Sequence, residues 1–135
     1  MHKPAPHAGL RHVALYVKNL ETCVDFYTRL LGMTIDWQPD PDNVYLTSGC
    51  DNFALHRAPK NFTVSGDQHL DHIGFFLTNR REVDDWYHWL DAAKVEMKAA
   101  PRDHRDGTRS FYCADPDGNI IQMIYVPNQP KITSK

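Results

Sequence analysis

The apolar positions along the chain follow two patterns, and each pattern appears twice. Short β-prone apolar runs at 13–17 and 73–77 predict buried strands. Each run ends at an Asn suited to cap a helix, Asn19 or Asn79, and apolar residues then recur at three- and four-residue steps. Gly32 follows the first of these stripes and is typical of a helix end. Each half of the chain is therefore predicted to begin with a strand and a helix.

Three further short strands are predicted behind each helix. In the first half they cover 34–37, 44–47 and 52–56, and in the second half 95–99, 110–113 and 119–126. Turn residues rich in Pro, Gly and Asp separate them, for example the stretch Asp-Pro-Asp-Gly at 115–118.

The two halves also repeat in sequence at an offset of 60. Residues 10–19 (LRHVALYVKN) align with residues 70–79 (LDHIGFFLTN), and the match continues into the helices with Asp25 over Asp85 and Leu30 over Leu90. The repeat predicts an α+β fold of two βαβββ modules, whose eight strands form a curved sheet around a concave cavity. We expect a single domain over 9–127, with modules at 9–57 and 69–127, a linker at 58–68 and flexible termini at 1–8 and 128–135.

Composition limits the class of protein. The chain has 135 residues, 41% of them hydrophobic and 24% charged, as is usual for a globular protein with a sizeable core. A net charge of −2 gives no reason to expect a nucleic-acid partner, and no apolar run is as long as a bilayer span. The three cysteines are widely spaced and odd in number, which indicates reduced thiols, and no signal peptide is recognised. These features predict a cytoplasmic protein with neither a nucleic-acid nor a membrane partner.

A histidine stands at the same position of both repeats, His12 in the first and His72 in the second. Residues two apart on a strand share a face, so His12 lies on the face of Ala14 and Tyr16, and His72 on the face of Gly74. Internal symmetry predicts that the two imidazoles meet in the concave interior, where they are candidate metal ligands. The alternative is that each is an ordinary hydrogen-bonded residue that lines the cavity.

The last predicted strand offers an oxygen ligand. Gln122 lies between Ile120 and Ile124 on one face, and a polar side chain there needs a partner. A metal held by two imidazoles commonly takes a third, oxygen ligand, so Gln122 is either that ligand or bonded to neighbouring groups.

Three stretches carry a family resemblance: LRHVALYV at 10–17, LDHIGF at 70–75 and DPDGNIIQ at 115–122. With them the chain resembles the vicinal oxygen chelate superfamily, which includes glyoxalases, bleomycin-resistance proteins, fosfomycin-modifying enzymes and extradiol ring-cleaving dioxygenases. The resemblance covers about residues 9 to 127 and implies the fold, whereas the superfamily hosts several chemistries.

Residues 104–122 resemble the signature of type I extradiol dioxygenases in particular. This resemblance implies that His12, His72 and Gln122 hold a non-haem metal, with Fe(II) favoured and Mn, Zn or Ni as alternatives. It implies His56 as the acid–base residue and His104 and Tyr112 as groups that bond substrate oxygens. The substrates would be O₂ and a catechol or other vicinal diol, and the apolar walls are expected from four aromatic residues: Trp37, Tyr45, Phe53 and Phe111.

Two residues depart from that signature. Gln122 stands where extradiol enzymes carry Glu, and a neutral amide is a weaker oxygen donor than a carboxylate. Arg102 stands where a small or aliphatic residue is usual.

Two other functions stay open. A glyoxalase-like isomerase or lyase would need a fourth ligand near Ala54, which cannot bind a metal, so His56 would have to replace it. A metal-free binding protein of the bleomycin-resistance kind would use the cavity to hold an aromatic ligand. A homodimer is expected in each case, since curved sheets leave exposed edges.

Overall fold

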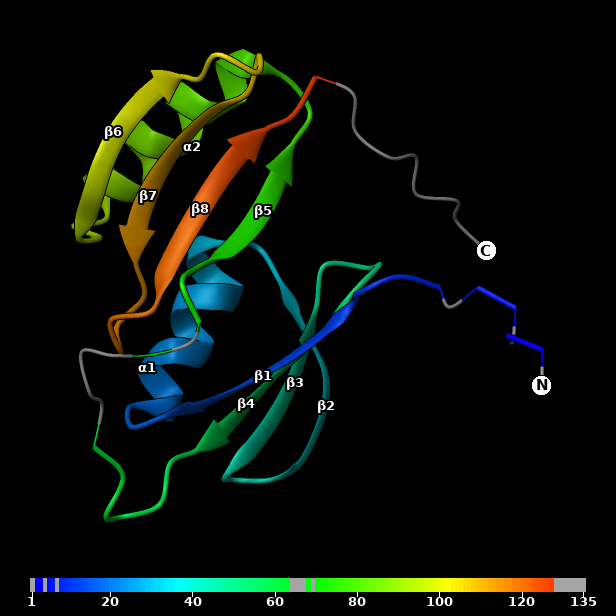
Figure 1. Ribbon diagram of the computed structural model, residues 1–135. Coiled ribbons are helices and arrows are strands. Elements are labelled where there is room, and N and C mark those ends of the chain that lie inside the picture. The colour runs from blue at the N-terminus through cyan, green and yellow to red at the C-terminus, as the bar shows by residue number, and fades with distance from the viewer. Residues whose placement is uncertain (1, 4, 7, 64–67, 69, 128–135) are drawn as a thin grey trace.

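The computed structural model describes residues 2–3, 5–6, 8–63, 68 and 70–127 (Figure 1). The expected linker and flexible ends fall partly outside these residues. The first half contains β1 (His12–Val17), α1 (Leu20–Asp25), η1 (Phe26–Leu30), β2 (Thr34–Asp40), β3 (Asn43–Thr47) and β4 (Asn52–Arg57). The second half contains β5 (Ile73–Leu77), α2 (Arg80–Ala92), β6 (Met97–Asp103), β7 (Arg109–Ala114) and β8 (Ile120–Tyr125). The predicted α+β fold of two βαβββ modules is confirmed.

The strands divide into two four-stranded sheets, one for each module. Their orders are β1-β4-β3-β2 and β5-β8-β7-β6. In both sheets the first strand pairs in parallel with the last, and the other pairs are antiparallel. Pro39 and Pro101 lie in the outer strands β2 and β6, whose registers shift, and an edge strand tolerates the missing N–H of proline.

The helix ends differ between the modules. The Asn79 side chain accepts from the Glu82 backbone N–H at 3.0 Å, while the Glu82 carboxylate accepts from the Thr78 N–H at 3.1 Å. The cap predicted at Asn79 is therefore confirmed. The equivalent prediction for Asn19 is wrong, because its side chain donates to Asp117 Oδ1 at 3.0 Å and makes no cap bond.

The first helix changes its winding before it ends. The Leu31 N–H reaches back to the Phe26 carbonyl at 3.0 Å, as the π-turn of η1 requires. Gly32 then takes a φ of +83°, a left-handed conformation that ends the helix as predicted.

One apolar cluster joins the two modules. Val17, Leu55 and Tyr27 of the first module belong to the same core as Leu90 and Phe111 of the second. The ring of Tyr27 lies 4.8 Å from that of Phe53 and 6.5 Å from that of Phe75. In Figure 1 the first helix accordingly lies beside the lower ends of β5 and β8, while α2 covers one face of the second sheet.

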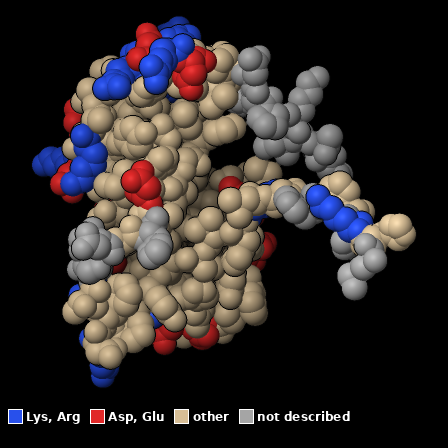
Figure 2. Space-filling model, viewed as in Figure 1, with Lys and Arg blue, Asp and Glu red and all other residues tan. Residues whose placement is uncertain are grey.

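The opposite face of each sheet is open. Tyr16 and Phe76, which are equivalent in the repeat, are 57% and 56% exposed, and Trp37 is 57% exposed. In Figure 2 the middle of the molecule is largely uncharged, and many of the charged side chains gather at the end formed by the second module. Within the described part of the chain, no helix is long and apolar enough to cross a membrane. The three cysteines form no disulfide.

Candidate metal and substrate site

Three neighbouring strands of the second sheet bring several of the predicted residues together. The register places Tyr112 of β7 beside Gln122 of β8, and Gln122 beside Gly74 of β5. His72 precedes β5, and its ring meets that of Tyr112 edge to face at 5.6 Å. His72, Tyr112 and Gln122 therefore form one group on the open face of this sheet.

The amide of Gln122 is oriented by its neighbours. Its nitrogen donates to Ser110 Oγ at 3.1 Å, and the same Oγ lies 3.0 Å from His104 Nε2. Ser110 is 1% exposed and Gln122 is 9% exposed, so water competes little for these bonds. The Gln122 oxygen forms no hydrogen bond with another described residue, and it would lie 3.8 Å from a Cβ built on Gly74. A glycine at 74 thus keeps space in front of this oxygen.

Both first-strand histidines have one ring nitrogen held by an oxygen. His12 Nδ1 lies 2.6 Å from Asn52 Oδ1, and His72 Nδ1 lies 2.6 Å from Asp71 Oδ2. Such a bond places the proton on Nδ1 and leaves Nε2 as a lone-pair donor, which is the arrangement that metal-binding imidazoles usually have. Neither Asn52 nor Asp71 had a recognisable signal in the sequence, although Asp71 directly precedes His72.

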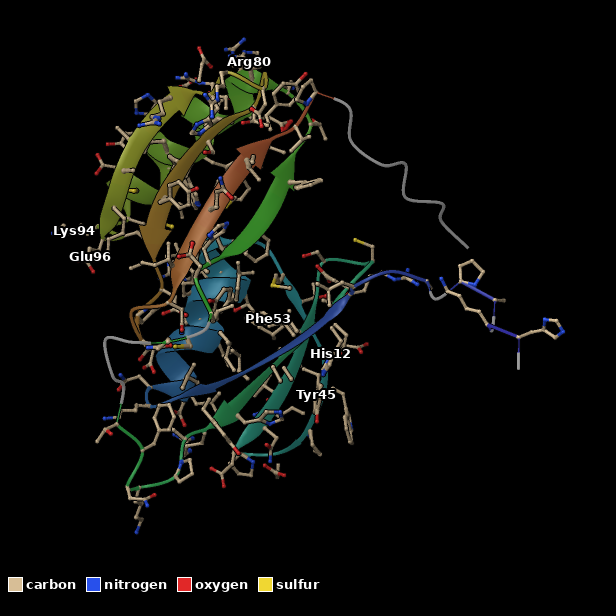
Figure 3. The ribbon with its side chains drawn as sticks, in the orientation of Figure 1. His12, Tyr45, Phe53, Arg80, Lys94 and Glu96 are labelled. Atoms are coloured by element: carbon tan, nitrogen blue, oxygen red, sulfur yellow. The ribbon has the colours of Figure 1, made fainter. Side chains whose placement is uncertain are left out.

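A second group lies on the open face of the first sheet. His12 and Tyr45 stand on one side of this sheet, and Phe53 stands on the other (Figure 3). His56 Nδ1 lies 2.6 Å from Asn43 Oδ1, and the His56 ring contacts Tyr45 at 5.8 Å. His56 is four residues along β4 from Asn52, the partner of His12, which is roughly 13 Å and leaves room for a small molecule between the two histidines.

The single chain does not bring the two groups together. His12 belongs to the first sheet and His72 directly precedes the second, and no hydrogen bond or ring contact joins them among the described residues. No cluster of three or more His, Cys, Asp or Glu that could hold a metal occurs in the described part of the chain. The expected meeting of the two imidazoles thus requires a contact that one chain alone does not make.

The predicted apolar walls are partly wrong. Tyr45 and Trp37 stack at 5.1 Å on the open side of the first sheet, as a ligand wall would require. Phe53 and Phe111, however, are 5% and 0% exposed and belong to the core between sheet and helix. Their strands were predicted correctly, but they occupy the alternate positions that point away from the cavity.

A cavity lies next to the first of these groups, that of His72, Tyr112 and Gln122 on the second sheet. It has a volume of about 670 Å³, and its lining includes His104, Tyr112, Gln122 and Ile124. A smaller cavity of about 240 Å³ shares His104 and Tyr112 with it and adds Ser110. The larger cavity therefore brings together the predicted oxygen ligand, Gln122, and both residues predicted to bond substrate oxygens, His104 and Tyr112.

Comparison with known proteins places this geometry in context. A model of the Glyoxalase/Bleomycin resistance protein/Dioxygenase superfamily matches residues 9–123. The chain is 29% identical over 117 residues to the metallothiol transferase FosB of Staphylococcus haemolyticus, covering 85% of this chain and 81% of that protein. It is 30% identical over 135 residues to the uncharacterized protein PA2024 of Pseudomonas aeruginosa, covering 86% of this chain and 87% of that protein.

Solved structures agree on the fold. The crystal structure of lactoylglutathione lyase from Agrobacterium tumefaciens superposes with a TM-score of 0.73 at 21% identity, covering 90% of this chain and 96% of that chain. A glyoxalase-related enzyme from Fulvimarina pelagi gives a TM-score of 0.75 at 19% identity, covering 92% of each chain.

Proposed function

The chain belongs to the Glyoxalase/Bleomycin resistance protein/Dioxygenase superfamily, and we propose that it is a metal-dependent enzyme whose divalent ion is held by His12, His72 and Gln122. The observation that carries this proposal is the hydrogen bonding around these three side chains. Both imidazoles have Nδ1 bonded to an oxygen, and the Gln122 nitrogen is bonded to Ser110. Two ring nitrogens and one amide oxygen therefore remain as donors.

This donor set fits a divalent ion of intermediate softness. Two neutral imidazoles with one oxygen suit Fe(II), Mn, Zn or Ni and leave coordination positions for a substrate. A bound ion would act as a Lewis acid and as a template for two neighbouring substrate oxygens. Because Gln122 brings no negative charge, the site would hold its ion less tightly than a site with a carboxylate.

We further propose that the site forms between two copies of the chain. His12 lies on the first sheet, whereas Gln122 lies on the second and His72 directly precedes it, so a second copy would supply the missing half to each. The half-exposed rings of Tyr16, Trp37 and Phe76 on the open faces support a partner surface there. Proteins of this superfamily commonly form dimers and bind small molecules.

Ring cleavage of a catechol with O₂ is the reaction for which the chain supplies the most additional groups. Tyr112 faces the cavity beside Gln122, where its hydroxyl would donate to a substrate oxygen. His104 Nε2 faces Ser110, so a substrate oxygen would meet its Nδ1 instead. His56 has Nδ1 bonded to Asn43, which leaves Nε2 to take a proton from the diol and return it as the ring opens.

Thiol transfer is the second candidate, and the FosB relatives favour it. Their match extends over 85% of this chain, and they are named as metallothiol transferases. A glyoxalase-like reaction has less support, because its fourth ligand would fall at Ala54, which pairs with Ala14 and offers no donor.

Metal content and turnover test the proposal together. The full chain is purified without chelators under anaerobic conditions, and its metals are measured beside those of the variants His12→Ala, His72→Ala and Gln122→Ala. His88→Ala, which changes an exposed histidine of α2, is the matched control. We expect near-stoichiometric metal in the wild type and the control and a strong loss in the other three.

Activity assays then separate the reactions. Oxygen uptake with catechol, in which both O₂ atoms enter the ring-opened product, supports the dioxygenase reading. Consumption of a thiol together with an electrophilic co-substrate, to which the thiol is transferred, supports the transferase reading. A wild-type protein that binds none of the four metals would contradict both.

A further inference from the structure

The wall of the larger cavity carries two arginines with no ionic partner among the described residues. Arg102 and Arg105 both line it, one on either side of His104 in sequence. Both are exposed, and no hydrogen bond or ion pair joins either side chain to another described residue. Arg102 is also one of the two residues that depart from the dioxygenase signature, so it is a feature of this chain rather than of the resemblance.

The acidic residues of the same cavity are already engaged. Asp103 accepts from Arg80 and, at 3.2 Å, from Arg109. Asp106 accepts from the Thr108 hydroxyl at 2.7 Å and from its N–H at 3.0 Å, and these bonds hold the pKa of Asp106 below its ordinary value. Among the described residues, neither carboxylate forms an ion pair with Arg102 or Arg105. The gathering of charged side chains at this end of the molecule is visible in Figure 2.

The two arginines lie close to the proposed metal and substrate site. Arg102 of β6 pairs with Ser110 of β7, and Ser110 is two residues, roughly 7 Å, from Tyr112 along the same strand. Tyr112 and Gln122 line the same cavity. A molecule about the size of one substituted ring could therefore touch the arginines and Tyr112 together.

We propose that Arg102 and Arg105 bind an oxyanion substituent of the substrate, a carboxylate or a phosphoryl or phosphonyl group. Planar guanidinium groups recognise such oxyanions through paired N–H donors. The inference rests on the proposed function only for the position of the rest of the substrate, near Tyr112 and Gln122. It narrows the substrate class to small anionic molecules, such as a catechol that carries a carboxylate.

The anion site can be tested without any metal. Chelator-treated full-length protein is titrated with benzoate, with phenyl phosphate and with the neutral benzyl alcohol, and binding is followed by amide chemical shifts. We expect one or both anions to bind with shifts in 102–112, and the alcohol not to bind. Binding should weaken when salt is raised, because exposed charges are screened.

Variants then locate the site. Arg102→Met and Arg105→Met should each weaken anion binding about tenfold, as expected for a lost hydrogen bond to a charged group. Arg81→Met removes the same charge from an exposed arginine that lines neither cavity, and it should leave binding unchanged. The relative strength of benzoate and phenyl phosphate identifies the preferred oxyanion.

The proposal fails if benzyl alcohol binds as tightly as the anions do or if neither anion binds. It also fails if the double variant, Arg102→Met with Arg105→Met, binds the anions as strongly as the wild type does. Those results would leave metal binding by His12, His72 and Gln122 unaffected. The reverse outcome is also distinguishable. If the wild-type protein binds none of the metals but still binds the anions through the two arginines, that result supports this inference and contradicts the proposed metal site.

Discussion

The buried hydroxyl of Tyr27 should contribute about 2 kcal/mol to the stability of the chain. Tyr27 is 0% exposed, and its hydroxyl donates to Asp115 Oδ2 at 2.7 Å. Asp115 is 4% exposed and lies in the turn before β8, so this bond links the first helix to the second module. Tyr27→Phe keeps the ring against Phe53 and Phe75 and removes only the bond.

The magnitude follows from the charge of the acceptor. A hydrogen bond to a charged group contributes roughly 1.5–3 kcal/mol, more than a bond between neutral groups. Asp115 keeps its bonds from the N–H groups of Asp117 and Asn119 and from the Asn119 side chain, so the variant should still fold. A loss of about 2 kcal/mol lowers the melting temperature of a chain of this size by roughly 6–10 °C.

Urea unfolding followed by circular dichroism measures the change directly. Tyr45→Phe is the matched control, because the Tyr45 ring stacks on Trp37 and its hydroxyl makes no hydrogen bond with a described residue. If Tyr27→Phe lowers the free energy of unfolding no more than Tyr45→Phe does, the bond to Asp115 does not contribute the predicted stability.

Three further predictions concern the site and the core. Ser110→Ala releases the Gln122 amide and should weaken Zn²⁺ or Mn²⁺ binding roughly 10- to 100-fold in titration calorimetry, whereas Ser48→Ala, an exposed serine of the β3–β4 turn, should change nothing. Gln122→Glu adds a charged oxygen donor, so elemental analysis should find more retained metal than in the wild type; unchanged content would argue against Gln122 as a ligand. Burial raises the pKa of the Cys113 thiol from 9.0 to about 12, so the folded chain holds this proton more tightly than the unfolded chain. Stability should therefore be full below about pH 9 and fall between pH 9 and 12, and the fall in the urea midpoint should be smaller in Cys113→Ala.

The fold was predictable because the information is local and repeated. The strand and helix periods occur twice at an offset of 60, so the elements predicted in one half supported those predicted in the other half. The same pattern predicted a cap at Asn19 and at Asn79. Only Asn79 is followed three residues later by a Glu, Glu82, which completes a capping box, whereas Thr22 stands at that position after Asn19. The hydrogen bond from Asn19 to Asp117 joins residues 98 positions apart, so no local sequence pattern could predict it.

The site was predictable only in part. Strand alternation placed His72 on the face of Gly74 and Gln122 on the face of Ile120 and Ile124, and in the structure Gly74 pairs with Gln122. Tyr112 was expected from the family resemblance alone, and it pairs with Gln122 on the other side. The partners that orient these groups, Ser110 and Asp71, carry no pattern of their own. How the two sheets sit relative to one another depends on long-range contacts such as that of Tyr27 with Asp115, so symmetry alone suggested a meeting of His12 and His72 that one chain does not make.

Mixing two inactive variants tests most directly whether two copies share one metal site. His12→Ala and His72→Ala each lose both sites of a homodimer, because every site then lacks one histidine, and the two variants complement each other only if the histidines of one site come from different copies. After subunit exchange of equal amounts, half of the dimers are mixed, and each mixed dimer regains one intact site. Bound metal should therefore recover to about a quarter of the wild-type amount. No recovery, in a mixture shown by mass spectrometry to contain mixed dimers, would contradict the shared site.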